Sequence, residues 1–349
     1  MFRPSLAAVS IGVLLGLVAT AKSFSLALLS GSPQTIVTPA ETSLDRLLEQ
    51  DRRVSAIAYR LTTANREFCV HQGPQWGLTL HSASMYGPRL RETVLIRHPI
   101  GEDVGISSLV PGGPADAAGL ALDDRVISIN GQALVSAPRG QARHTSASYH
   151  QVEAAWAMLN AGGERAQVEI LRRDHRLRLT VMPQPGCAYD ALVTPSSQIN
   201  ASADGRHILV TSGLVAYAQS DDDLALILGH ELAHNVLQHR LQLDRSGFAR
   251  GLLGNLGSSP ASLNRVEREA DYVGLYLTAR AGFDIGGAEM FWRRALGQLG
   301  DPWYLRWSHP GDRERAANAR ATIDEIAALV IAGEPLVPDT SRLTHWPPR

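Results

Sequence analysis

The 349-residue sequence lacks an excess of charge of either sign, with 33 Lys and Arg residues against 34 Asp and Glu residues. A protein that binds nucleic acid through its surface charge needs a basic excess to neutralise the phosphates. We therefore expect no nucleic-acid partner. After residue 21, no run of residues is long and apolar enough to cross a bilayer, so any membrane association should occur through the N-terminus.

Cysteine is also scarce, because Cys69 and Cys187 are the only two in the chain. In an oxidising compartment, an even number of cysteines favours a disulfide. A bond between these two would close a long loop in the middle of the chain, which loop-closure entropy values at about 4 to 5 kcal/mol. Two buried thiols are the alternative, because the sequence does not give the Cα separation that a disulfide needs.

The N-terminal segment has the pattern of a targeting signal. Arg3 precedes an uncharged and mostly apolar run at 5–19, and Ala19-Thr20-Ala21 fits the small-residue cleavage pattern of signal peptides. We interpret residues 1–21 as a signal peptide that directs export. An uncleaved membrane anchor is the alternative, because the uncharged run approaches the length of a membrane-spanning helix.

The rest of the chain divides into segments of different texture, and its 44% apolar composition suffices for two ordinary cores. After a linker at 22–42, residues 43–68 show an amphipathic helical pattern that starts near Thr42 and Asp45. We expect this helix to pack on the C-terminal module, although a dimer interface would show the same apolar stripe. The further segments are a β-type region at 70–185, a mainly helical region at 187–335 and a C-terminal tail at 336–349.

Within the β-type region, residues 110–134 (VPGGPADAAGLALDDRVISINGQAL) resemble the core signature of a PDZ domain. The resemblance extends over 70–185 and implies a small β-rich domain that captures extended peptides as an added strand beside a helix. A peptide site would then include Gly77, in the candidate carboxylate-binding loop, and His150, which begins the long helix. The alternative is a structural role for both residues.

The segment from Asp221, DDDLALILGHELAHNVLQHRLQL, has helical periodicity and an acidic first turn that suits the helix dipole. His230 and His234 are four residues apart and share one helix face, so both imidazoles can reach a single ion. Glu231 lies near the same face. It is therefore predicted to act as a general base toward a water molecule without binding the ion itself.

A catalytic zinc site needs a third protein ligand. The next helical pattern opens near Asn264 and places Glu267 and Asp271 on one face. We assign Glu267 to the metal and Asp271 to a ligating histidine, whose tautomer a carboxylate can fix. Glu269 points about 160° away from this pair and is predicted to be solvent-exposed. The predicted cofactor is one Zn2+ ion per chain.

The other histidines have no companion at ligand spacing. His239 follows His234 by five residues, which on a continuous helix places it well off the ligand face, so we interpret it as a surface or capping group. The same surface interpretation applies to His71, His81, His98, His144, His175, His207 and His345.

Taken together, HELAH at 230–234, EREAD at 267–271 and Ser308-His309-Pro310 with Arg315 resemble the gluzincin family. That family includes the CAAX prenyl protease, the HtpX heat-shock protease and the mitochondrial Oma protease. The resemblance implies an α+β fold in which a mainly helical zincin catalytic domain with a small edge sheet follows the β-rich PDZ-like domain. It also implies a zinc-dependent endopeptidase.

The same resemblance implies roles for three further parts of the chain. His309 would stabilise the oxyanion and Arg315 would support the site. An edge strand containing Ile208, Leu209 and Val210 would hold an extended polypeptide substrate.

Several members of this family cross the membrane many times, whereas this chain has at most one span, so it looks like the soluble bacterial branch. We therefore expect a periplasmic enzyme that cleaves misfolded or unassembled envelope proteins, with inner-membrane anchoring as the alternative location. The PDZ-like domain would recruit substrates or regulate the enzyme. Two other readings remain: a peptide-binding chaperone or adaptor with little hydrolysis, and a latent protease whose cleft is covered by the PDZ-like domain or by residues 246–262.

Overall fold

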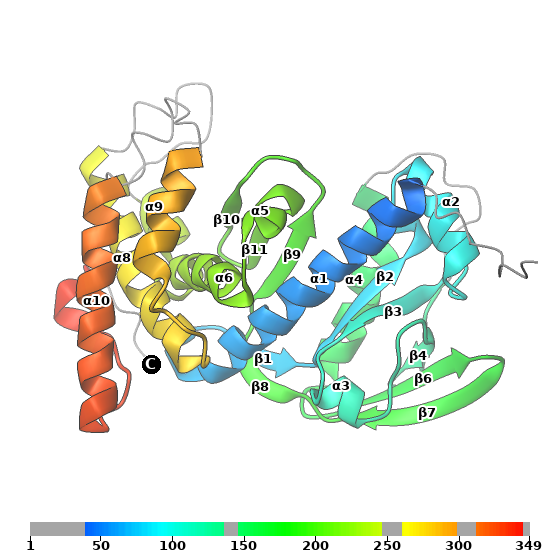
Figure 1. Ribbon diagram of the computed structural model, residues 1–349. Coiled ribbons are helices and arrows are strands. Elements are labelled where there is room, and N and C mark those ends of the chain that lie inside the picture. The colour runs from blue at the N-terminus through cyan, green and yellow to red at the C-terminus, as the bar shows by residue number, and fades with distance from the viewer. Residues whose placement is uncertain (1–38, 136–145, 246–259, 299–311, 345–349) are drawn as a thin grey trace, which may run out of the picture. The chain divides into compact units, whose positions relative to one another are not determined.

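The computed structural model describes residues 39–135, 146–245, 260–298 and 312–344 (Figure 1). The α-helices are α1 (Pro39–Ala64), α2 (Pro88–Arg97), α3 (Pro114–Ala117), α4 (His150–Ala161), α5 (Ser212–Tyr217), α6 (Asp221–Val236), α7 (His239–Arg245), α8 (Pro260–Arg280), α9 (Ala288–Gln298) and α10 (Asp312–Ala332). The 3-10 helices are η1 (Arg66–Phe68), η2 (Ala83–Met85), η3 (Ser146–Tyr149) and η5 (Thr340–Arg342). The strands are β1 (Gln72–Gln75), β2 (Leu78–Ser82), β3 (Val104–Leu109), β4 (Arg125–Ile129), β5 (Gln132–Ala133), β6 (Ala166–Arg172), β7 (His175–Val181), β8 (Gln184–Cys187), β9 (Asp190–Thr194), β10 (Ala201–Ala203) and β11 (His207–Thr211).

The expected α+β class is confirmed: a strand-rich region precedes a helical one (Figure 1). The expected signal peptide at 1–21 lies outside the described residues, as does most of the linker. Within the described ranges, none of the helices combines the length and the apolar character that a membrane crossing requires.

The strand-rich region is built on an antiparallel sheet with the order β2-β3-β4-β6-β7, and β5 pairs with β4. The β4–β5 hairpin turns at Asn130 and Gly131, which both have positive φ angles of 52° and 77°. Asn-Gly is the pair that such a turn favours, because asparagine and glycine tolerate the left-handed region. A separate apolar core lies under this sheet, with Ile106, Ile129 and Ile170 fully buried in it.

The helical region is organised by the crossing of α6 and α8, where two backbones nearly touch. A Cβ atom on Gly274 of α8 would lie 2.9 Å from both the N and Cα atoms of His230 on α6. A Cβ atom on Gly229 would lie 2.2 Å from Oγ1 of Thr278. Real Cβ atoms do not approach that closely, so glycine is required at both positions for this separation. The crossing thereby brings the carboxylates of α8 within reach of the histidines of α6.

The small sheet beside α6 has the order β10-β11-β9. Its middle strand β11 pairs antiparallel with β10 and parallel with β9, so both of its backbone edges are occupied. The prediction that Ile208, Leu209 and Val210 form an edge strand for substrate is therefore wrong. Of these three strands β10 and β9 are the outer ones, and β10 contacts α6.

Helix α1 begins at Pro39, before the expected start, and proline suits a first helical turn because its missing N–H would have no partner there. Its apolar stripe serves two cores. Leu44 and Leu48 pack in a small cluster with Val94 of α2, whereas Val54, Ile57 and Leu61 belong to the core of the helical region. The expected packing on the C-terminal module thus describes only the second half of the helix.

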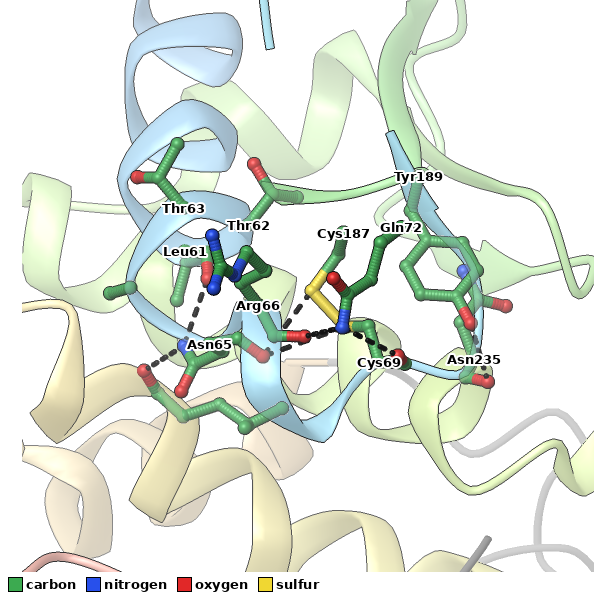
Figure 2. Close-up of a disulfide and its surroundings, with 12 residues drawn as sticks. Leu61, Thr62, Thr63, Asn65, Arg66, Cys69, Gln72, Cys187, Tyr189 and Asn235 are labelled. Carbon is green, nitrogen blue, oxygen red and sulfur yellow. Dashed lines mark hydrogen bonds between the residues drawn. A yellow bond between two sulfur atoms is a disulfide. The ribbon is translucent and has the colours of Figure 1, made fainter. Parts of the chain in front are cut away.

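Cys69 and Cys187 form a disulfide with a Cα–Cα distance of 5.4 Å, and both residues are buried (Figure 2). Cys187 lies at the end of β8, opposite Gln72 of β1. The bond therefore ties the segment that follows α1 to the strand that leaves the sheet region, and closes a loop across a sequence separation of 118 residues.

Removing this disulfide should destabilise the chain strongly. Closure of so long a loop restricts the unfolded chain, and the double variant Cys69→Ala/Cys187→Ala should lose about 4 kcal/mol of unfolding free energy. Chemical denaturation with and without a thiol reductant measures the loss. The reductant should lower the midpoint of the parent protein and leave that of the double variant in place; a parent protein indifferent to reduction would contradict the prediction.

Candidate metal centre

The structure brings together three side chains at the α6–α8 crossing whose ligand atoms could hold one ion: His230, His234 and Glu267. The two Nε2 atoms of the histidines lie 3.1 Å apart. Glu267 places Oε2 3.5 Å from Nε2 of His230, and Oε1 3.6 Å from Nε2 of His234. The three residues are largely buried, with side-chain exposures between 8% and 16%.

These distances fit a tetrahedral metal site with one position left for a water molecule or substrate. Ligands bound at about 2.0 to 2.1 Å on the corners of a tetrahedron lie about 3.3 Å from each other, close to the separations in this triangle. Two imidazoles and one carboxylate are also a donor set that zinc accepts. The residues present therefore fit the ion that the sequence pattern predicts.

Asp271 holds His230 from the side opposite to this triangle. Oδ1 of Asp271 lies 2.9 Å from Nδ1 of His230, which leaves Nε2 directed toward Glu267. Arg315 of α10 in turn binds Asp271 through two parallel contacts, one of them from Nε to Oδ2 at 2.7 Å. The guanidinium also lies over the ring of Trp292, 3.9 Å from its centroid. A chain of buried groups thus fixes the orientation of the first histidine.

The charges of this chain of groups are set by burial and by the partners. Burial alone would raise the pKa of Asp271, but the charge of Arg315 and the contact with His230 hold it below its usual value. Burial disfavours the charged form of His230, yet Asp271 and Glu267 outweigh it and raise the pKa to about 10. For His234, burial dominates and lowers the pKa to about 3. A metal ion must therefore displace a proton from His230, so we expect binding to weaken as the pH falls.

His234 is held by a second set of groups that the sequence did not predict. Its Nδ1 lies 2.9 Å from Nδ1 of His239, and Nε2 of His239 lies 3.2 Å from Oε2 of Glu269. The other oxygen of Glu269 accepts hydrogen bonds from the backbone N–H and the hydroxyl of Thr344. The surface interpretation of His239 and the predicted exposure of Glu269 are both wrong, since only 1% and 4% of these residues is exposed.

The tautomers along this second set are determined by the carboxylate. Burial would raise the pKa of Glu269, but its hydrogen bonds to His239 and Thr344 hold it below the usual value, so it remains an acceptor at neutral pH. Nε2 of His239 therefore carries the hydrogen, and its Nδ1 accepts one from Nδ1 of His234. This leaves the Nε2 lone pair of His234 free to bind an ion.

Replacing His239 should weaken metal binding. His239→Phe fills the buried space but removes the acceptor for Nδ1 of His234, and loss of such an outer contact costs about 10- to 100-fold in metal affinity. Zinc titration against a competing chelator measures the dissociation constant. His175→Phe, at an exposed position of β7, is the matched control and should bind as the parent does. Equal affinities for all three proteins would show that His239 does not position the ligand.

Three other predicted site residues are not part of the ligand triangle. Glu231 is buried beside His230 on α6. Burial would lower the pKa of Arg315, but Asp271, then Glu267 and last Glu231 raise it above its usual value. His309 lies outside the described residues. Arg315 reaches the site through Asp271, as described above.

In the sheet region, Gly77 directly precedes β2 and His150 is the exposed first residue of α4, which contacts β2. Gly77 has a structural reason to be glycine, with a φ of +69° and Pro114 Cδ 3.0 Å from the position of a Cβ atom. A peptide site at these residues stays a prediction.

Comparison with known proteins agrees with both halves of this description. Residues 172–249, which include the two histidines of α6, match peptidase family M48, and residues 105–142 match the PDZ domain. The chain contains a peptidase family M48 domain and a PDZ domain. The matched part of the M48 domain ends before α8, so the assignment of Glu267 rests on the geometry of the site.

Curated relatives carry names from the same group of enzymes. The mitochondrial metalloendopeptidase OMA1 of Schizosaccharomyces pombe is 31% identical over 132 residues, which cover 32% of this chain and 39% of the relative. OMA1 of Arabidopsis thaliana is 30% identical over 181 residues, covering 46% and 37%. The beta-barrel assembly-enhancing protease of Escherichia coli is 25% identical over 168 residues, covering 39% and 34%. The chain thus spans less than two fifths of the length of these relatives.

Proposed function

We propose that this protein is a zinc-dependent metalloendopeptidase that cleaves polypeptides of the bacterial envelope. Its PDZ domain would recruit substrates or regulate the enzyme. The observation that carries the proposal is the triangle of His230, His234 and Glu267, with edges of 3.1, 3.5 and 3.6 Å. Each histidine of this triangle is oriented by a buried carboxylate, directly through Asp271 or by way of His239 through Glu269. Such support is typical of working metal sites and costs stability if it serves no ion.

The chain's own residues would divide the chemistry among them. Zinc, when bound, polarises a scissile carbonyl and lowers the pKa of water. Glu231, next to a ligand in sequence but not part of the triangle, would take the proton of the attacking water and return it to the leaving amine. Arg315 and Asp271 would keep His230 fixed while the charge at the site changes.

The outer strand β10 is the better candidate for holding an extended substrate than β11. Ala201–Ala203 pairs with β11 on one side and contacts α6, which carries the two histidines. A peptide added beside β10 would run past the metal helix, and hydrogen bonds to the strand would hold it with little dependence on sequence. This mode of binding would let the enzyme accept polypeptides of many different sequences.

The cellular location rests on the N-terminal pattern and on the relatives. Residues 1–21 have the composition of an export signal or anchor, and one group of relatives is named for beta-barrel assembly. We propose that the enzyme acts in the periplasm or is anchored facing it. The disulfide between Cys69 and Cys187 supports an oxidising compartment, since such bonds are rare where thiols are kept reduced.

Removal and return of the metal test the proposed activity. Incubation with a chelator should abolish cleavage of unfolded casein by the full chain, and zinc added in slight excess should restore it. The readout is the appearance of peptide fragments, so an adaptor or chaperone without hydrolysis would give no signal in either state. Casein cleavage that persists at full rate after complete metal removal would refute the proposal.

A further inference from the structure

A second group of metal-ligand side chains lies in the strand-rich region, away from α6 and α8. His81 of β2, His98 at the end of α2 and Asp123 before β4 each bring a ligand atom within 4.8 Å of the other two. The two imidazole rings are in edge contact, with centroids 5.5 Å apart. The three residues come from separate segments, so the fold rather than local sequence brings them together.

Both histidines of this cluster have one ring nitrogen occupied and the other without a partner. Nδ1 of His81 lies 2.8 Å from the hydroxyl of Tyr86, and Nδ1 of His98 lies 2.6 Å from Oδ1 of Asp123. The Nε2 atoms of both rings are buried and have no hydrogen-bond partner among the described residues. Buried polar atoms are almost always paired, so these two nitrogens in adjacent rings are available to bind a water molecule or an ion.

Whether each Nε2 atom carries a hydrogen or a lone pair decides what it can bind. A carboxylate can only accept, so Nδ1 of His98 carries the hydrogen, and in the neutral ring Nε2 presents a lone pair. His81 is only 2% exposed and its Nδ1 lies against the hydroxyl of Tyr86, so Nε2 is the ring nitrogen that an ion would meet. Neutral imidazoles are the form that binds metal. The contact between His98 and Asp123 is also the carboxylate–histidine pairing that orients metal ligands.

We propose that the Nε2 atoms of His81 and His98 bind a divalent transition metal, with zinc as an ion that imidazoles favour, and that Asp123 orients His98 from the other side of its ring. The side chain of Asp123 is 38% exposed and that of His98 15%, which gives an ion a path from solvent. The ion would link β2 to the end of α2, which Asp123 ties to the turn before β4, and would so stabilise this part of the strand-rich region.

Zinc titration of the full chain carrying His230→Ala and His234→Ala tests the second site in isolation, because these substitutions dismantle the M48 site. We expect about one equivalent of zinc per chain to bind and to raise the thermal unfolding midpoint. Adding Asp123→Asn should weaken this binding at least tenfold and remove the rise in midpoint. Asparagine is suited to the position, since Asp123 has a φ of 66°, which asparagine tolerates.

His98→Gln in the same background should have the same effect as Asp123→Asn, and circular dichroism checks that each variant is folded. His175→Gln, at an exposed position of β7, is the matched control and should bind zinc as the background protein does. Absence of zinc binding by the background protein would overturn the proposal. So would zinc binding that survives both Asp123→Asn and His98→Gln, because the ion would then lie elsewhere. Neither zinc binding nor the unfolding midpoint depends on peptidase activity, so failure of this proposal would leave the proposed function untouched.

Discussion

Glu231→Gln should leave zinc bound while reducing casein cleavage by at least about 100-fold and up to about 10,000-fold. Glutamine keeps the size of the side chain but cannot accept the proton of the attacking water, and general-base catalysis contributes rate factors of this size. The ligand triangle does not include Glu231, so metal content should remain at the parent level. Metal analysis and initial rates on the same preparation measure the two effects together.

The conservative variants separate a general base from a merely structural glutamate. Glu231→Asp keeps the acid but shortens its reach, so it should retain zinc and regain part of the rate lost in Glu231→Gln. Glu92→Gln, at an exposed position of α2, is the control and should cleave as the parent does. If Glu231→Gln cleaved casein at the parent rate with zinc bound, the proton would have to be taken by another group.

The α6 part of the site could be predicted because its information is local. Residues four apart on a helix share a face whatever the rest of the fold does, so His230 and His234 needed only the helical period of α6. The third ligand was suggested by the same rule on α8, where Glu267 and Asp271 share a face. The separation of the two helices was beyond that rule, because it depends on the contact of Gly229 and Gly274 with the opposite helix.

The interpretation of His239 failed because it assumed that one helix continues. Helix α6 ends at Val236, Gln238 takes a positive φ of 54°, and His239 begins the separate helix α7. The angle counted along a single helix therefore does not apply. Glu269 was expected to face solvent, but α7 and the segment at Thr344 cover it. Both errors have the same cause. Other elements bury these side chains, and the periodicity of a single helix does not reveal such contacts.

Sheet order and the second histidine cluster were beyond the sequence for a related reason. The pattern identified β11 as a strand, but whether a strand is central or outer depends on pairing with β9 and β10. His81, His98 and Asp123 show no ligand spacing, because their proximity arises from the packing of β2, α2 and the turn before β4. The fold can thus bring isolated histidines of the sequence into one cluster, and the surface interpretation of His81 is wrong, since only 2% of it is exposed.

Arg315→Ala should have a large effect on stability and on metal affinity together. Arg315 is 4% exposed and its guanidinium neutralises the buried carboxylate of Asp271, which would be left beside His230 without its main partner. Removing one member of a buried ion pair costs about 3 to 5 kcal/mol of unfolding free energy. Because Asp271 orients a ligand, we also expect zinc affinity to fall about 10- to 100-fold.

Two variants on the same helix distinguish this role from a general effect of lost charge. Arg315→Lys keeps the charge but cannot make two parallel contacts with Asp271, so it should fall between Arg315→Ala and the parent in zinc affinity. Arg320→Ala removes an exposed arginine that pairs with Asp324 and should change the unfolding free energy by less than about 0.5 kcal/mol. Urea denaturation and chelator competition measure both quantities. Zinc binding by Arg315→Ala at parent affinity would show that Asp271 holds His230 without help from α10.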